Sequence, residues 1–200
     1  MKVIGLCGGS GSGKGRVCEI FAELGVPSID TDLVYRDMTL RDSPCLRALR
    51  QEFGDKVVSQ DGSLNRAFLR TLVFGGDNAT LNRDKLNSIT HKFILDETRN
   101  ILSQYERAGV LAAIVDAPLL FESGFASECD LTVCVTADEG VRISRIALRD
   151  GISESDAKKR ISGQIPDEEL SRRCDFVIKN DGDITSLRQQ VVNLHKKIII

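Results

Sequence analysis

The chain has 200 residues, of which 42% are hydrophobic and 28% are charged, and its formal net charge is -2. This composition is typical of a compact globular domain, and the near-neutral net charge gives no indication of the strongly basic surface on which most nucleic-acid binding depends. No apolar run approaches the roughly 20 residues of a membrane span, and the apolar N-terminal stretch is too short for a signal peptide. We therefore expect one domain with neither a nucleic-acid nor a membrane partner.

The predicted elements alternate between strand and helix. Residues 2–7 form a buried strand pattern, and residues 14–24 follow with apolar side chains at helical spacing. Further strand patterns occur at 26–30, 110–118, 130–135 and 175–180. Such alternation is typical of an α/β fold with a five-stranded parallel sheet covered by helices on both faces.

Two segments interrupt this pattern. Between residues 43 and 108 only helical spacing recurs, in 66–74, 83–89 and 92–108, which predicts a helical insertion. The polar stretch 153–174 opens with a capping box from Ser153 to Asp156 and is equally consistent with a mobile lid and with a solvated helical hairpin. The expected single domain then has a core of about 1–42, 109–140 and 174–200, an insertion of about 43–108 and a lid of about 141–173.

The stretch GLCGGSGSGKGRV, from Gly5 to Val17, lies between the first strand and the first helix. Its glycines let backbone N–H groups approach phosphate oxygens, and Lys14 can reach the β- and γ-phosphates at the positive end of the helix. The pattern predicts an ATP site with Mg²⁺, against the alternative of a glycine-rich turn without a ligand. The predicted nucleotide-binding residues are Gly9, Ser10, Gly11, Ser12, Gly13, Lys14, Gly15 and Arg16.

Gly15 departs from the phosphate-loop pattern, which has a serine or threonine after the lysine. That hydroxyl normally binds Mg²⁺. We expect ATP to bind and Mg²⁺ to be held less firmly, by phosphate oxygens, by water, and by Asp32 or Asp116.

The second strand ends in IDTDLVYR, which places Asp30 and Asp32 at the carboxyl edge of the sheet, where ligands gather. One carboxylate there could take a proton from an acceptor hydroxyl, or each could simply cap the next helix. Arg36, one turn beyond Asp32, is available for a substrate phosphate or for an ion pair.

Six cysteines (Cys7, Cys18, Cys45, Cys129, Cys134 and Cys174) are scattered without any C-x-x-C pair. Free thiols in a reducing cytoplasm explain them better than disulfides or a metal. The two histidines lie about a hundred residues apart, so no zinc site is expected.

Several segments in order along the chain resemble the dephospho-CoA kinase family: the phosphate loop, GVPSIDTDLVYR, DGSLNRAFLRTLVF, LNSITHKFI, VDAPLLFESG, RIALRDGISESDAKKRISGQ and CDFVIKNDGD. The resemblance implies a phosphate-loop, three-layer fold similar to nucleoside monophosphate kinases, with a helical CoA-binding subdomain and a helical lid. It implies transfer of a phosphoryl group from ATP to the ribose 3′-hydroxyl of 3′-dephospho-CoA, the last step of coenzyme A biosynthesis. A cytoplasmic enzyme, monomeric or weakly self-associating, is expected.

The resemblance also assigns residues to roles. Lys14, Asp32 and Arg145 would be catalytic, with Asp32 as the base, and Arg149 and Asn180 would lie near the nucleotide. The acceptor side would comprise Asp32, Arg36, Arg66, His91, Pro118, Leu119, Leu120, Glu122 and Gln164. The family has a proline where Lys92 stands, a difference expected to alter only a helix start.

Two other functions remain open from the sequence. One is a different small-metabolite or nucleotide kinase of the same fold, which a panel of acceptors would distinguish. The other is a nucleotide-binding regulator with weakened catalysis, which would bind ATP tightly without transfer.

Overall fold

A computed structural model of the protein describes residues 1–75 and 77–198. The chain divides into two compact units, Met1–Ile29 with Gln104–Ile200, and Asp30–Ser103. Residues 76, 199 and 200 belong to the predicted ranges 43–108 and 174–200 and lie outside the described residues.

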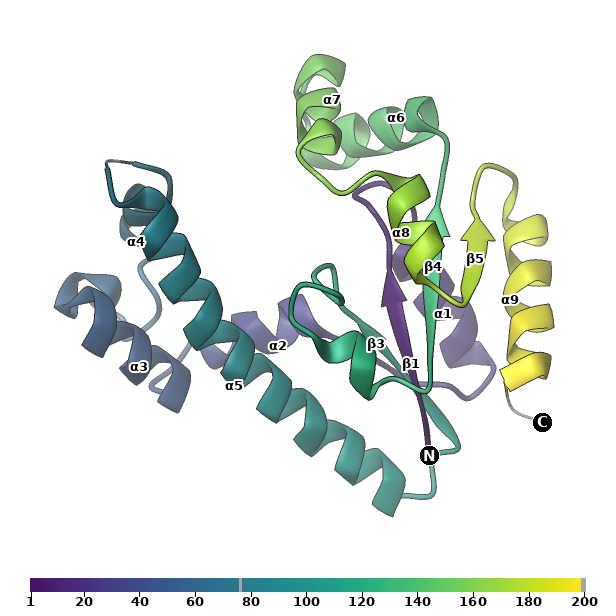
Figure 1. The fold of residues 1–200 in the computed structure, drawn as a ribbon, viewed down its shortest axis with the longest axis horizontal. Coiled ribbons are helices and arrows are strands. Elements are labelled where there is room, and N and C mark those ends of the chain that lie inside the picture. Colours follow the sequence, from purple (N-terminus) through teal and green to yellow (C-terminus); the bar gives the residue numbers. More distant parts are fainter. Residues whose placement is uncertain (76, 199–200) are drawn as a thin grey trace. The chain divides into compact units, whose positions relative to one another are not determined.

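The first unit is built on a five-stranded sheet in the order β2-β3-β1-β4-β5 (Figure 1). Strand β1 pairs in parallel with β3 and β4, and β4 pairs in parallel with β5. The middle strands carry runs of consecutive buried residues, because both faces of a parallel sheet are covered. The predicted five-stranded parallel sheet is confirmed, with β1 (Lys2–Cys7), β2 (Ser28–Asp30), β3 (Ala112–Asp116), β4 (Leu131–Thr136) and β5 (Phe176–Lys179).

Helices α1 (Lys14–Glu23) and α9 (Ile184–Ile198) pack against each other and against the sheet. On α1, Val17, Ile20 and Phe21 follow the i, i+3, i+4 spacing that puts apolar side chains on one face, and all three are fully buried. This packing fixes the first turn of α1 against the carboxyl end of β1, with only residues 8–13 between them.

The remaining helices of the first unit follow the carboxyl ends of the strands. They are the 3₁₀ helix η2 (Phe125–Glu128) and the helices α6 (Glu139–Asp150), α7 (Glu154–Ser162) and α8 (Asp167–Arg173). The expected cap of α7 is confirmed, since Oγ of Ser153 accepts a hydrogen bond of 3.1 Å from the amide of Asp156. On α6, Ile146 is fully buried and its Cγ1 lies 3.1 Å from the position that a Cβ atom on Gly11 would occupy. Helix α6 therefore packs directly under the glycine-rich loop.

The second unit consists of helices. Its core gathers buried side chains of α3 and α4, among them Leu46, Leu49 and Leu69. Three of its helices begin at a capping side chain, from Asp30, Ser43 and Asn65. Its elements are α2 (Thr31–Met38), α3 (Pro44–Phe53), the 3₁₀ helix η1 (Asp55–Val57), α4 (Arg66–Phe74) and all but the last turn of α5 (Ala79–Arg107).

The two helical segments predicted at 83–89 and 92–108 are one continuous helix, α5, so the predicted break is wrong. The gap fell at Thr90, a residue of modest helix propensity. In the structure its hydroxyl donates to the carbonyl oxygen of Leu86 at 2.8 Å and its side chain is buried, so packing overrides propensity. His91 and Lys92 therefore lie inside a helix, and the expectation that Lys92 alters a helix start is wrong as well.

Helix α5 is the longest helix among the described residues. Neither it nor any other helix within residues 1–75 and 77–198 combines the length and the apolar character that a membrane span needs.

Candidate functional site

The glycine-rich loop joins the end of β1 to the start of α1. Its tight course requires glycine at particular positions: Gly13 has a φ of 93°, and a Cβ atom there would lie 2.1 Å from Nδ2 of Asn180. A Cβ atom on Gly9 would lie 2.1 Å from Nη2 of Arg142. The loop is therefore shaped by polar side chains that approach its backbone too closely for any larger residue.

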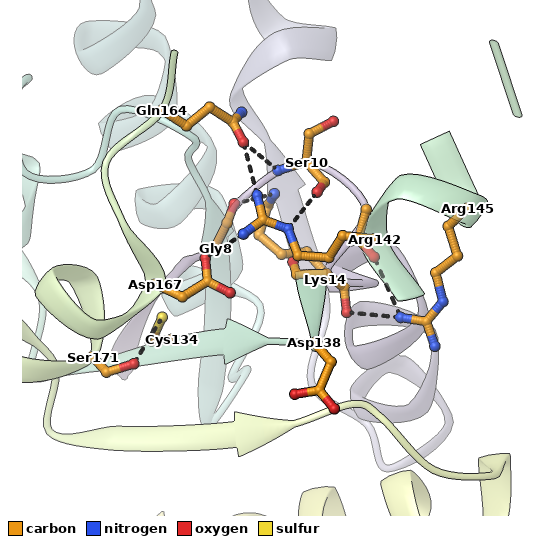
Figure 2. Close-up of polar contacts among 12 residues, drawn as sticks. Gly8, Ser10, Lys14, Cys134, Asp138, Arg142, Arg145, Gln164, Asp167 and Ser171 are labelled. Carbon is orange, nitrogen blue, oxygen red and sulfur yellow. Dashed lines mark hydrogen bonds and ion pairs between the residues drawn. The ribbon is translucent and has the colours of Figure 1, made fainter. Parts of the chain in front are cut away.

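Four carbonyl oxygens of the loop accept hydrogen bonds from side chains. Lys14 donates from Nζ to the carbonyl oxygen of Gly8 at 3.0 Å. Nε of Arg142 donates to the carbonyl oxygen of Ser10 at 2.9 Å (Figure 2). Nη1 of Arg145 lies 3.3 Å from the carbonyl oxygen of Gly11, and Nδ2 of Asn180 donates to that of Ser12 at 2.8 Å.

The start of α1 adds a second source of positive potential. The first N–H groups of a helix have no partner within it, and the N-cap residue Gly13 has no side chain to satisfy them. The first turn of α1 contains no acidic residue that would compete with an anion. The side-chain hydroxyl of Ser12 is fully buried and, in the described part of the chain, has no hydrogen-bond partner. The loop, the helix start and Lys14 together form a site suited to a phosphate group.

Arg142 is the residue that most strongly ties the loop to the helices that follow. Its side chain is only 5% exposed. Besides the bond to Ser10, its Nη1 donates to Asp167 at 2.7 Å and its Nη2 to Oε1 of Gln164 at 3.0 Å. That same Gln164 oxygen accepts a hydrogen bond from the backbone N–H of Ser10 at 3.0 Å, so both backbone polar groups of Ser10 have a side-chain partner (Figure 2).

Sequence reasoning missed Arg142 and Asp167. The signal was present, because Arg142 and Arg145 are three residues apart and so share one face of α6. Burial raises the pKa of Asp167 above its usual range, although Arg142 acts in the opposite direction. The charged form of Asp167 therefore depends on the guanidinium beside it.

The other predicted lid arginine, Arg149, contacts a different group. Its Nε and Nη2 donate to the two carboxylate oxygens of Asp150 at 2.7 and 2.9 Å, and the side chain is 59% exposed. Arg160 also pairs with Asp150, and these two cations lower the pKa of its carboxyl to about 2. The structure thus brings Arg145, and not Arg149, to the loop.

Two further groups of the first unit bear on the predicted site. Asp116, at the end of β3, pairs in register with Leu6 of β1 and lies beside the start of the loop, and its carboxylate is a hard oxygen donor that suits Mg²⁺. A Cβ atom on Gly15 would meet nothing within 4 Å, so the space for a larger side chain exists there.

In the turn after β3, Pro118, Leu119 and Glu122 are exposed, whereas Leu120 is fully buried. A Cδ atom of Leu120 lies 2.8 Å from the position of a Cβ on Gly5. Leu120 therefore supports the turn from inside, and any ligand contact falls to its exposed neighbours.

The predicted acceptor residues of the second unit lie on α2, α4 and α5. Asp30 caps α2, since its Oδ1 accepts the amides of Asp32 and Leu33 at 2.9 and 3.1 Å. Asp32 is exposed in the first turn of α2, and Arg36 lies one turn further, also exposed. Of the two carboxylates, Asp30 is therefore the one that caps α2.

Arg66 opens α4 beside a groove. Its guanidinium donates to the hydroxyl of Thr39 at 3.0 Å and lies 5.4 Å from the ring centre of Tyr35. The groove of about 450 Å³ is mostly apolar with Arg66 and Arg70 as its cations. His91 is half-buried on α5. A groove of this character suits a ligand with both apolar and anionic parts.

The chain is similar in sequence to one family of known proteins over almost its whole length. A sequence model of the dephospho-CoA kinase family matches residues 2–186. The dephospho-CoA kinase of Syntrophotalea carbinolica is 37% identical over 100% of this chain and 93% of its own length, and that of Corynebacterium efficiens is 38% identical over 98% and 96%.

Solved structures give the same result for the fold. The dephospho-CoA kinase of Campylobacter jejuni superposes with a TM-score of 0.72 at 26% identity, covering 100% of this chain and 98% of that one. A shikimate kinase from Acinetobacter baumannii, solved with shikimate, has a TM-score of 0.55 at 13% identity over 99% and 93%, and shares the fold alone.

The pairing of Arg142 with Asp167 leads to a stability prediction. In Arg142→Met the half-buried carboxylate of Asp167, which is 20% exposed, loses its cation, so we expect a loss of about 1–3 kcal/mol in the free energy of unfolding. The double variant Arg142→Met/Asp167→Asn should recover part of the loss, because no charge is left unpaired. Urea denaturation measures both.

The control for this prediction is Arg149→Met on the same helix, where an exposed side chain should change stability by no more than about 0.5 kcal/mol. Equal losses in the single and double variants would show that the pairing of Arg142 with Asp167 is not the source.

Proposed function

The chain belongs to the dephospho-CoA kinase family and phosphorylates dephospho-CoA in coenzyme A biosynthesis, and from this premise we propose which of its residues do the work. The donor is ATP, and the proposed acceptor atom is the ribose 3′-hydroxyl. The observation that most supports the donor side is the loop whose carbonyl oxygens are bound by Lys14, Arg142, Arg145 and Asn180.

Lys14 is proposed to stabilise the transferred phosphoryl group. Charge in the loose transition state spreads over the γ-phosphate oxygens, so catalysis rests on positioning and on neutralising that charge. The ammonium of Lys14 now donates to the carbonyl oxygen of Gly8, and a short side-chain rotation would exchange this neutral acceptor for a phosphate oxygen. Arg145, held at the loop by Gly11 and Asn180, is proposed as the second cation.

Asp32 is proposed to orient the acceptor hydroxyl and to accept its proton. Its neighbour Asp30 is occupied by capping α2, which leaves Asp32 as the exposed carboxylate of that turn. Arg36 and Arg66 are proposed to bind anionic groups of the acceptor, with the groove beside Arg66 taking its apolar part.

Mg²⁺ is proposed to bind with ATP, where it would neutralise phosphate charge. Asp116 would hold it through a carboxylate oxygen, together with phosphate oxygens and water, because Gly15 offers no hydroxyl. The monomeric or weakly associated state and the cytoplasmic location expected from the sequence stay predictions.

The direct test of function is an assay for coenzyme A by mass, with purified protein, ATP, Mg²⁺ and 3′-dephospho-CoA. Lys14→Met should raise the activation barrier by about 3–4 kcal/mol, the effect of losing one group that stabilises charge in the transition state, and turnover should fall accordingly. A panel of other acceptors, including nucleoside monophosphates and shikimate, should give little ADP. If any of these acceptors is turned over faster than 3′-dephospho-CoA, the proposed acceptor is wrong.

Asp32→Asn should reduce turnover by about 10²-fold or more, which is the usual effect of losing a general base, and leave ATP affinity near that of the wild type. Asp84→Asn, on α5 of the same unit, removes an exposed carboxylate and should keep full activity. Full turnover in Asp32→Asn would end the assignment of the base.

Gly15→Ser should lower the Mg²⁺ concentration that gives half-maximal activity, because it adds the hydroxyl ligand in open space. Gly15→Ala is the matched control, since it adds a Cβ without an oxygen. Identical Mg²⁺ dependence in all three proteins would contradict the idea that metal binding is weakened by the glycine.

A further inference from the structure

Three cysteines that are far apart in the sequence meet in the first unit. Cys7 ends β1, Cys134 lies in β4, and Cys174 follows the last turn of α8, just before β5. Cys7 and Cys134 are register partners on neighbouring parallel strands, so their side chains leave the same face of the sheet. The three sulfur atoms all lie within 4.8 Å of one another, and those of Cys7 and Cys174 are 3.4 Å apart.

The three-cysteine cluster is buried except at one member. Cys7 and Cys134 are buried, with 1% and 0% exposure, whereas Cys174 is half-buried and gives access from one side. An ion can therefore reach the two buried sulfurs from the side of Cys174.

The spacing of the three sulfurs and their chemistry together indicate which metal ions the cluster could bind. At a metal–sulfur bond of about 2.3 Å, three sulfurs around one ion lie roughly 3.8–4.0 Å apart. The distance of 3.4 Å between the sulfurs of Cys7 and Cys174 and the upper limit of 4.8 Å for the other two pairs are compatible with this value. Thiolates select soft ions such as zinc(II) and copper(I), whereas Mg²⁺ and Ca²⁺ require oxygen ligands.

We propose that Cys7, Cys134 and Cys174 form a three-sulfur binding site for a thiophilic d¹⁰ metal ion, zinc(II) or copper(I). Binding replaces the thiol protons of the three cysteines, which pass to solvent, and no electron is transferred. Copper(I) would take the three sulfurs alone, and zinc(II) would add a fourth ligand from solvent.

The position of Ser171 supports solvent access to the fourth ligand position. Its hydroxyl lies 3.9 Å from the sulfur of Cys134, and it lines a cavity of about 680 Å³ between β4 and the helices α6, α7 and α8. Asp167, the carboxylate of the same helix, is engaged by Arg142 and is not needed as a ligand. The three cysteines lie outside the loop of residues 8–13, whose carbonyl oxygens are bound by Lys14, Arg142, Arg145 and Asn180.

The test is a metal titration of the full-length, reduced and chelator-treated protein, in separate arms with zinc(II), copper(I), cadmium(II) and Mg²⁺. We expect one ion per chain for the first three metals, with a sulfur-to-metal charge-transfer band in the near ultraviolet for copper(I) and cadmium(II). Three thiols should become protected from alkylation, as counted by mass. The Mg²⁺ arm should give neither the band nor the protection.

The variant Cys174→Ala, which changes the least buried member of the cluster, should lose stoichiometric binding and the band. Cys174→Ser serves the same purpose with a smaller change of shape. Cys129→Ala is the matched control, because Cys129 is also a half-buried cysteine of the first unit and its thiol donates to the carbonyl oxygen of Phe125 outside the cluster.

Binding in Cys174→Ala that equals the wild type, or a wild-type titration without the band and without protection of Cys7, Cys134 and Cys174, would overturn the proposal. If neither Cys174 variant folds, the identity of the protected thiols in the wild-type protein decides the question alone.

Discussion

The structure of the donor site depends on hydrogen bonds to the carbonyl oxygens of the glycine-rich loop. In a planar trans peptide the C=O and N–H groups point in opposite directions. Arg142, Arg145 and Asn180 bind the carbonyl oxygens of Ser10, Gly11 and Ser12. The N–H groups of Gly11 and Gly13 are therefore turned the other way, whereas that of Ser12 donates to the carbonyl oxygen of Gly9 at 3.1 Å. The protein thereby orients amide donors for an anion before the anion arrives, and the cost of ordering them is met on folding.

Local patterns were enough to predict the sheet, the loop and the first helix. Alternation of apolar runs and helical spacing gave the five parallel strands, because burial on both faces leaves a signal in each strand separately. The cap of α7 at Ser153 was predicted for a similar reason, since a cap is settled within four residues. Helix α4 was predicted at its observed bounds of Arg66 and Phe74.

What the sequence could not supply depends on contacts between distant residues. The break expected near Thr90 failed because burial of that side chain outweighs its weak helix propensity. The role of Arg142 follows from Asp167, which lies 25 residues further on, and from the turn between α7 and α8. The cluster of Cys7, Cys134 and Cys174 needs the strand register, which no spacing in the chain reveals.

Gly15 stands apart from the other glycines of the loop. A Cβ atom at Gly9 or Gly13 would collide with a side chain, whereas at Gly15 it would meet nothing within 4 Å and the backbone has no positive φ. Glycine within a helix is also about 1 kcal/mol less favourable than alanine. Neither packing nor conformation therefore accounts for glycine here, and what it changes is chemical. The position after Lys14 presents no hydroxyl, so a protein ligand for the proposed Mg²⁺ would come from elsewhere at the edge of the sheet, where Asp116 lies.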